Sequence, residues 1–177
     1  MQDSEKTRPD ALVDDTHIHF MKKALEYACL ATESEDVPVG AVVVCDGEIV
    51  SYGYNRREGN KNAVSHAEIE AIDKACKKLG GWRLHRCDLY VTLEPCPMCA
   101  GAIINSRIKN VYYGASDGKA GAFGGLFDMN AFALNHHPTV VGGICEEECS
   151  SLLSEFFAEL RIKRKHGGEE RKKWKKN

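Results

Sequence analysis

The sequence has no apolar run long enough to cross a membrane, and its first residues show no signal-type hydrophobic stretch. It also lacks internal repeats and any change of composition that would mark a linker between two domains. The chain has 177 residues, enough for one domain with a substantial core. We therefore expect a single-domain cytoplasmic protein without a membrane partner. Residues 1–15 are polar and are expected to form a disordered extension.

The eight cysteines do not have the regular spacing of a small disulfide-linked scaffold. Four of them lie within or beside apolar stretches and are interpreted as reduced core residues: Cys29, Cys45, Cys76 and Cys87. Cys145 and Cys149 are four residues apart, but no further Cys or His follows at ligand spacing. A second metal site is therefore not predicted there.

The net charge of −2 conceals an uneven distribution of charged residues. Residues 161–177 contain nine Lys or Arg and two Glu, whereas the rest of the chain carries 15 basic and 24 acidic residues. Such a basic segment is typical of proteins that bind polyanions. A solvated terminus that keeps an acidic body in solution is an equally good interpretation. Residues 164–177 are expected to be a disordered basic tail.

Strands and helices alternate along the remaining chain. Hydrophobic periodicity predicts helices at about residues 17–32, 65–79, 95–106 and 146–163, and strands at 39–45, 48–55, 89–93, 111–114 and 139–142. Asp46-Gly47 predicts a two-residue hairpin between the first two strands. An opening hairpin followed by alternating elements predicts an α/β fold over residues 16–163, with a mixed five-stranded sheet and helices on both faces.

The clearest chemical signal joins His66-Ala67-Glu68 to Cys96 and Cys99 downstream. One imidazole and two thiolates give Zn²⁺ three protein ligands and leave one position open, as in catalytic rather than structural zinc sites. Cys96 and Cys99 are three residues apart, so their sulfurs share one face of a helical turn. A helix start there favours the thiolate form. A redox pair is the alternative, but His66 and Glu68 favour one Zn²⁺ per subunit.

Glu68 is predicted to carry protons rather than to bind the metal. On a regular helix, side chains two residues apart point about 200° away from each other. For both to face one ion, His66 must lie at the helix edge with non-helical dihedrals, with Ser65 as a capping residue. The alternative for Glu68 is an exposed acid of the first turn. The pattern predicts hydrolytic deamination, in which Glu68 moves protons from water to a ring nitrogen and to the departing ammonia.

The residues around these motifs resemble the bacterial tRNA-specific adenosine deaminase family over about residues 18–161. The resemblance rests on Val37-Pro38-Val39-Gly40-Ala41-Val42, Asn55-Arg56, His66-Ala67-Glu68-Ile69, Trp82-Arg83-Leu84, residues 89–103 and Ser106-Arg107-Ile108. It implies a three-layer α-β-α, cytidine-deaminase-like fold. It also implies conversion of adenosine to inosine at the wobble position of the tRNA anticodon, in bacteria chiefly in an arginine tRNA. The resemblance further implies a homodimer whose partner subunit helps to shape each site for the anticodon stem-loop.

The same resemblance assigns substrate contacts to five residues: Asn55, Ala67, Asp117, Lys119 and Phe157. Asn55 would hydrogen-bond the extruded base, and the backbone around Ala67 would polarise the reacting group. Asp117 and Lys119 match loop positions that contact the RNA backbone, and Phe157 matches an aromatic side chain beside the splayed nucleotides. Unstacked bases held by aromatic and cationic groups suit such a substrate. Lys119 could instead be an ordinary surface lysine, and Phe157 a core residue at helical spacing.

Two departures from the family lie in the loop at residues 118–125. Phe123 is bulkier than usual, and Gly125 replaces a Ser or Thr, so the choice of tRNA is less firmly indicated than the reaction. His136 and His137 are interpreted as turn or surface residues. One alternative function is deamination of free guanine, cytosine or a nucleotide, which uses the same zinc chemistry. The other is a non-catalytic zinc- and RNA-binding subunit, which would have no use for Glu68.

Overall fold

The computed structural model describes residues 14–174, and side chains as far as residue 165. The helices are α1 (Asp15–Ala31), α2 (Arg57–Asn60), α3 (Ala67–Leu79), α4 (Pro97–Ser106) and α5 (Glu146–Trp174), with short 3₁₀ turns η2 (Thr32–Ser34) and η3 (Met129–Ala131). The strands are β1 (Gly40–Cys45), β2 (Glu48–Tyr54), β3 (Cys87–Leu93), β4 (Asn110–Ala115) and β5 (Thr139–Val141). None of the helices in residues 14–174 combines the length and apolar character that a bilayer crossing requires.

The five strands form one mixed sheet in the order β2-β1-β3-β4-β5, which confirms the predicted fold class. Strand β1 is antiparallel to both β2 and β3, whereas β3, β4 and β5 are mutually parallel. Asp46 and Gly47 both have positive φ, as the predicted two-residue hairpin requires. Because β2 and β3 are each antiparallel to β1, they run in the same direction. Their carboxyl ends therefore lie at the same edge of the sheet, and α3 and α4 begin there.

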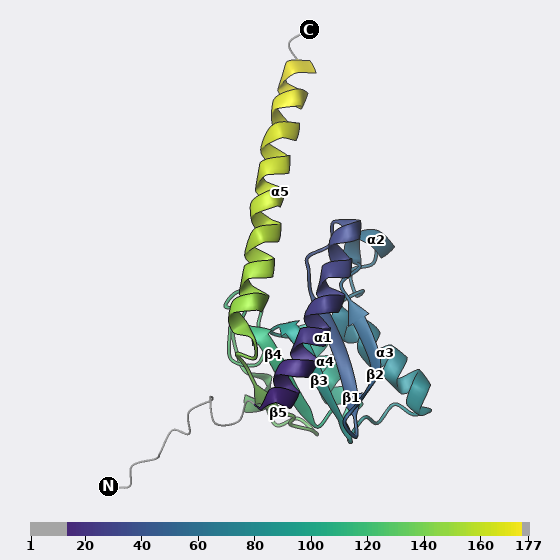
Figure 1. Cartoon of the computed structure of the whole chain (residues 1–177). Helices are drawn as coiled ribbons and strands as arrows, with labels where there is room; N and C mark the ends of the chain where they lie inside the picture. Colours follow the sequence, from purple (N-terminus) through teal and green to yellow (C-terminus); the bar gives the residue numbers. More distant parts are fainter. Residues whose placement is uncertain (1–13, 175–177) are drawn as a thin grey trace, which may run out of the picture.

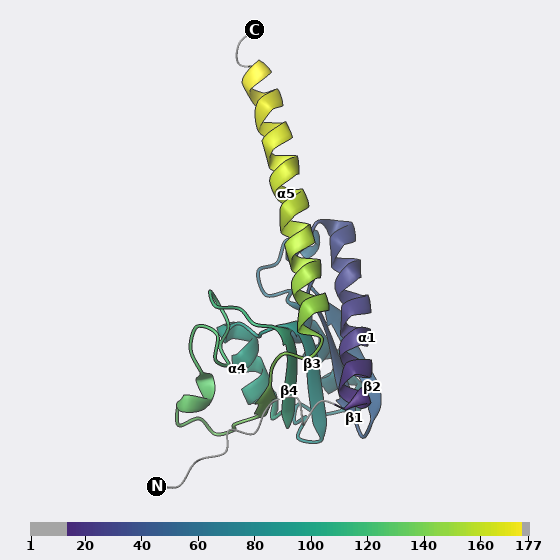
Figure 2. The same cartoon turned by 60° about the vertical axis from the view of Figure 1, so that its left-hand side comes forward.

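Helices cover both faces of the sheet, as Figures 1 and 2 show. Alternate residues of β1 point to opposite faces, as in any strand. Ala41 and Val43 join the core beneath α3 and α4, whereas Val42 and Val44 pack with α1 and the first turn of α5. A Cβ on Gly53 of β2 would collide with the α3 backbone, so glycine allows this helix to lie close to the sheet. The close packing fixes the start of α3 relative to the sheet edge.

The last helix is longer than the sequence indicated. The prediction ended it near residue 163 and gave residues 164–177 to a disordered tail, but α5 continues to Trp174 and extends away from the body of the protein (Figure 1). The apolar periodicity that identifies a buried helix ends before this point. The segment has no proline and is rich in Lys, Arg and Glu, which favour helix formation. Residues 175–177 lie outside the described residues.

At the other end, the predicted extension falls mostly on residues 1–13, which lie outside the described residues. Asp14 caps α1, where its side chain accepts hydrogen bonds from the amides of Thr16 and His17, and Asp15 begins the helix. All eight cysteines are free. The core interpretation holds for Cys87, but Cys29 is exposed on α1 because the buried face of that helix is formed by other residues.

Candidate active site

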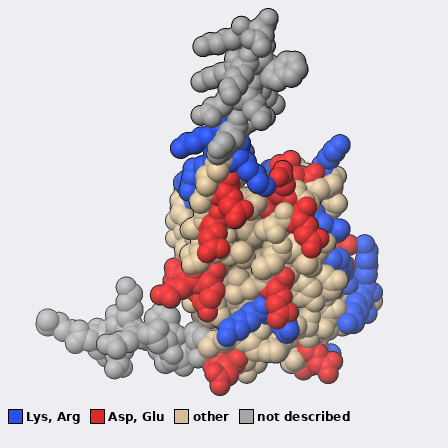
Figure 3. Space-filling model, turned by 45° about the horizontal axis from the view of Figure 1, so that its top comes forward, with Lys and Arg blue, Asp and Glu red and all other residues tan. Residues whose placement is uncertain are grey.

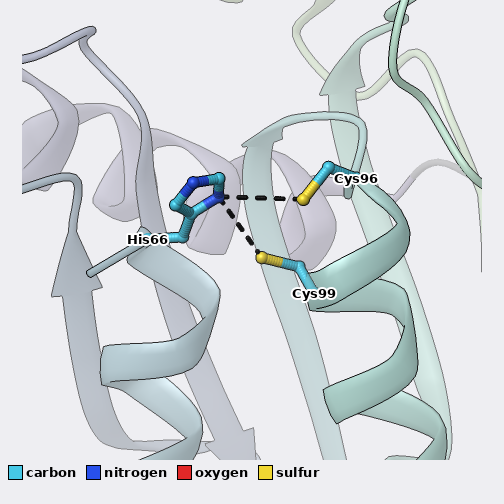
Figure 4. A group of neighbouring side chains, drawn as sticks. All are labelled: His66, Cys96 and Cys99. Carbon is cyan, nitrogen blue, oxygen red and sulfur yellow. Dashed lines mark hydrogen bonds between the residues drawn. The ribbon is translucent and has the colours of Figure 1, made fainter. Parts of the chain in front are cut away.

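His66, Cys96 and Cys99 converge between the first turns of α3 and α4 (Figure 4). His66 Nδ1 lies 3.8 Å from Cys96 Sγ and 3.5 Å from Cys99 Sγ. A tetrahedral zinc ion with ordinary Zn–N and Zn–S bonds would separate such atoms by about 3.6 Å. The three donors therefore fit Zn²⁺. The structure offers no other group of His, Cys, Asp or Glu side chains with this spacing within its described residues.

The backbone at each helix start explains this convergence. His66 is the N-cap of α3, with φ −86° and ψ 153°, and Cys96 is the N-cap of α4 with a similar extended conformation. The predicted non-helical conformation of His66 is confirmed. The capping role predicted for Ser65 is wrong, because Ser65 precedes the N-cap and its hydroxyl accepts a hydrogen bond from the Asn60 side chain. Both ligand helices point their N-termini at the site, where the dipoles stabilise negative charge.

The two thiols have opposite proton affinities. A hydrogen bond from Cys99, with a further contribution from His66, lowers the pKa of Cys96 to about 4. The same hydrogen bond and burial raise the pKa of Cys99. Cys96 is therefore the intrinsic thiolate of the pair. A metal cation among these atoms would ionise Cys99 as well, since a coordinating thiol loses its proton.

Glu68 is not the exposed acid that the sequence left as an alternative. Its side chain is only 4% exposed and lines the same cavity as His66 and Cys96. Burial raises the pKa of Glu68, while the neighbouring His66 acts in the opposite direction. A buried carboxyl with a raised pKa can both accept and return a proton near neutral pH. This environment suits the predicted proton carrier.

A cavity of about 260 Å³ opens onto Glu68 and the metal-ligating side chains. Asn55 lines it from the end of β2, is 7% exposed, and donates from Nδ2 to the Val37 carbonyl. Its Oδ1 has no hydrogen-bond partner, one of two such buried side-chain atoms in the described part of the chain. A buried acceptor without a partner costs about 1–3 kcal/mol. A ligand N–H would remove that cost.

Comparison with known proteins agrees with this site. Residues 15–161 match the MafB19-like deaminase family model. A tRNA-specific adenosine deaminase from Bacillus subtilis is 50% identical over 147 residues, which cover 82% of this chain and 91% of that relative. The chain belongs to the tRNA-specific adenosine deaminase family. It is an enzyme of the hydrolase class that acts on carbon–nitrogen bonds.

Two solved structures separate the alternatives within this superfamily. A tRNA:A34 deaminase studied for A-to-I editing at the wobble position of transfer RNA superimposes with a TM-score of 0.71 at 44% identity, covering 76% of this chain and 99% of that chain. A guanine deaminase from Bacillus subtilis gives a TM-score of 0.54 at 44% identity, covering 56% of this chain and 64% of that chain. The tRNA enzyme therefore matches over nearly its whole length, and the free-base enzyme does not.

Most of the substrate-contacting residues predicted for this family lie around the cavity. Ala67, Asp117 and Phe157 line it together with Asn55, whereas Lys119 is exposed and does not. Phe157 is 41% exposed, so it is not the core residue considered as an alternative. The Asp117 carboxylate accepts hydrogen bonds from the amides of Lys119 and Ala120. The RNA contacts of these residues stay predictions.

Sequence reasoning missed Glu94, which holds the loop at residues 117–125 over the site. Glu94 is buried, and its carboxylate accepts hydrogen bonds from three backbone amides, those of Asp117, Phe123 and Gly125, at 2.9–3.0 Å. A Cβ on Gly125 would collide with the Glu94 carboxylate and the Asp117 carbonyl. Gly125, noted as a departure from the family, thus permits close packing of this loop. A charged residue directly after a buried strand was the available signal for Glu94.

Phe123, the other departure, does not border the RNA-facing side as expected. It is buried in the core cluster beneath α3 and α4. The two histidines noted in the sequence bind backbone carbonyls: His136 Nε2 lies 2.6 Å from the Ile108 oxygen and His137 Nε2 lies 2.9 Å from the Phe132 oxygen. These contacts agree with their interpretation as structural residues. The loop departures therefore change the packing of the loop more than the lining of the cavity.

Arg57 is a second cavity residue that sequence reasoning missed. It begins α2 and lines the cavity beside Asn55. The turn is held by Asp36, whose buried carboxylate accepts hydrogen bonds from the amides of Glu58 at 2.8 Å and Gly59 at 3.1 Å. The α2 turn thus supplies a positive charge at the rim of the site. Only the three-dimensional placement of α2 reveals it, since Arg57 lies outside the zinc motifs.

Replacing Asn55 with alanine is expected to lower kcat/KM for the RNA substrate by roughly 5- to 100-fold, the effect of losing one buried hydrogen bond. Steady-state inosine formation measures this loss. Asn130→Ala is the matched control, because Asn130 carries the other unpartnered buried oxygen but does not line the cavity. Equal losses in both variants would show that the Asn55 effect comes from folding rather than from substrate contact.

Proposed function

We propose that this protein hydrolyses adenosine to inosine at the wobble position of a tRNA anticodon and releases ammonia. The observation that carries the proposal is the buried Glu68 beside a three-ligand His/Cys/Cys group, at a cavity where the Asn55 oxygen awaits a donor. The family supports the choice of RNA adenosine over a free base. A merely structural zinc site would be closed by a fourth ligand and would not need Glu68.

The chain's own residues supply the positioning and the proton transfers. His66, Cys96 and Cys99 would hold one Zn²⁺ per subunit, and zinc bound there would supply the Lewis acidity that ionises water near neutral pH. Glu68 accepts the proton that water loses as its oxygen bonds to the ring carbon. It returns protons to the ring nitrogen and to the amino group, so that ammonia departs and a carbonyl remains. Asn55 orients the base through its free oxygen.

The proposed partners are the anticodon stem-loop, of an arginine tRNA, and a second copy of the chain in the cytoplasm. Exposed apolar side chains support a homodimer. Leu126 and Phe132 are 58% and 57% exposed, and Phe127 and Leu134 are exposed nearby in the same segment. Apolar groups gathered on one surface segment are typical of protein interfaces. This segment follows the loop that Glu94 holds over the cavity, so a partner bound there would lie close to the site.

The decisive experiment offers the zinc-loaded enzyme an arginine tRNA anticodon stem-loop with adenosine at the wobble position. We expect inosine and ammonia in equal amounts, and negligible turnover of free guanine, cytosine or nucleotides. The reverse pattern would assign the protein to the free-base deaminases. Binding of the stem-loop without ammonia release would favour the non-catalytic subunit. Sequencing of cellular tRNA with and without the protein gives the set of edited tRNAs.

The basic end of α5 is proposed to contact RNA phosphates. Lys163, Arg164 and Lys165 are exposed, and Figure 3 shows basic side chains where α5 leaves the body, beside mixed charges elsewhere on that face. Truncation after Lys165 preserves the 3.0 Å ion pair between Lys163 and Glu35. It is expected to weaken stem-loop binding and to shallow the salt dependence by about 0.7 per lost contact. Fluorescence anisotropy at several salt concentrations measures both.

Lys77→Ala with Lys78→Ala is the control for that truncation. These lysines lie in the last turn of α3, at the end opposite the site. The double variant removes positive charge without shortening α5 and should leave the salt slope unchanged. An unchanged slope in the truncated protein would restrict the basic segment to a role in solubility.

A further inference from the structure

Cys45 and Cys87 form a pair of thiols directly opposite each other in the sheet. Cys45 is the last residue of β1, Cys87 is the first of β3, and the antiparallel register makes them Cα partners. We propose that this pair is a modification site at which a low-molecular-weight disulfide oxidises the two thiols to a reversible cross-strand disulfide. The site is separate from the zinc-ligand group, which contains two other cysteines.

The backbone places the two residues at the closer of the two possible pair spacings. The Cys87 carbonyl accepts from the Lys109 amide at 2.9 Å and its amide donates to the Leu84 carbonyl at 2.9 Å, so its backbone bonds are not made with β1. Cys45 pairs across the two-residue hairpin with Glu48 of β2. Cys45 and Cys87 are therefore a non-hydrogen-bonded pair, in which Cα atoms lie about 4.5 Å apart. That spacing falls within the range of about 4.4–6.8 Å found for disulfides.

The two thiols divide the chemistry between them. Cys45 is partly exposed at the hairpin, whereas Cys87 is 1% exposed and hydrogen-bonds to Cys45. The Cys45 thiolate attacks a small disulfide RSSR, forming Cys45–S–S–R and releasing one RS⁻. Cys87 then loses its proton and attacks the Cys45 sulfur, which forms the cross-link and expels the second RS⁻. Two protein thiols are oxidised, and one RSSR is reduced to two thiols.

The environment of Cys87 sets the rate of closure. Burial, with hydrogen bonding to Cys45, raises the pKa of Cys87 to about 12. The second step is therefore slow at neutral pH and accelerates as the pH rises. The linked form has no ionisable group at this position, so burial does not oppose it. Once formed, the cross-link is shielded on the Cys87 side, where the sulfur lies in the core beneath α3 and α4.

The cross-link would act on stability rather than on catalysis. Strand β3 runs from Cys87 to Leu93, and Cys96 follows at the opposite edge of the sheet. The disulfide closes residues 46–86, including α3 with His66 and Glu68, into a covalent loop. Such a loop restricts the unfolded chain and raises the melting temperature. The cavity lies at the far end of β3, so turnover at moderate temperature should stay unchanged.

The test treats the full-length, zinc-loaded protein with oxidised glutathione at mildly alkaline pH. We expect loss of two free thiols, a linked peptide containing Cys45 and Cys87, and an increase in Tm of roughly 5–15 °C, all reversed by dithiothreitol. Peptide mass spectrometry and thermal unfolding provide these readouts, and neither requires a tRNA substrate.

Cys45→Ser should abolish both the linked peptide and the increase in Tm, while Cys29→Ser, at an exposed cysteine of α1, should retain both. The Tm of reduced Cys45→Ser shows whether that variant folds normally. If it does not, Cys87→Ala provides the same comparison. Glutathione held on Cys45 without closure, linkage through other cysteines, or a linked form with unchanged or lower Tm would each overturn the proposal.

Discussion

Glu68→Gln is expected to reduce the rate of inosine formation by about 10²- to 10⁴-fold, the usual contribution of a positioned general acid–base group. Glutamine keeps the size of the side chain but cannot exchange a proton with water or with the leaving amine. Glu68 is buried and belongs to the first turn of α3, so the neutral isostere should not disturb the helix. Single-turnover kinetics on the stem-loop isolates this step from product release.

Zinc content distinguishes a proton carrier from a metal ligand. Glu68→Gln and Glu68→Ala are both expected to retain one zinc per subunit by elemental analysis. Glu70→Gln is the matched control in the same helical turn, where Glu70 instead receives two hydrogen bonds from the Arg56 guanidinium at 2.9 and 3.0 Å. This control should change stability more than turnover. Full activity in Glu68→Gln would refute the proton-carrier role, and loss of zinc would make Glu68 a ligand.

The sequence predicted the reactive groups because their chemistry is written in residue types at short spacing. Two cysteines three residues apart, with a histidine and a glutamate beside another helix start, leave few other uses. The dihedrals of His66 could even be deduced, because a regular helix would turn it away from Glu68. The strand order follows from the same logic, since a hairpin and alternating elements leave little choice of sheet.

The surroundings of the site were harder to predict, because they depend on backbone groups and on distant segments. Glu94 binds amides of residues 117–125, and a backbone N–H leaves no mark in the sequence. Phe123 and Phe157 are both aromatic, yet one is buried in the core and the other borders the cavity. Periodicity alone could not separate them. The extension of α5 was missed for a related reason, since an exposed helix needs no apolar stripe.

Cys99→Ala is expected to remove the metal, abolish detectable turnover and lower the melting temperature together. Cys99 is fully buried in the first turn of α4, and its thiol is also the main group that lowers the pKa of Cys96. Its loss therefore removes one ligand and weakens the thiolate of the other. A metal that binds only the folded chain stabilises it by mass action, about 4 kcal/mol at 1,000 times Kd. For a chain of this length, that corresponds to a Tm decrease of roughly 8–16 °C.

Removal of the metal from the unaltered protein with a chelator should reproduce that decrease, and added Zn²⁺ should restore both Tm and activity. Cys76→Ala is the matched control, because Cys76 is a partly buried cysteine of α3 outside the ligand group. It should keep its zinc and its turnover, at the cost of packing alone. If Cys99→Ala held zinc as tightly as the unaltered protein, the ligand set would have to be revised. If chelation left Tm unchanged while activity disappeared, the metal would serve the reaction alone and the two helix starts would be held by packing.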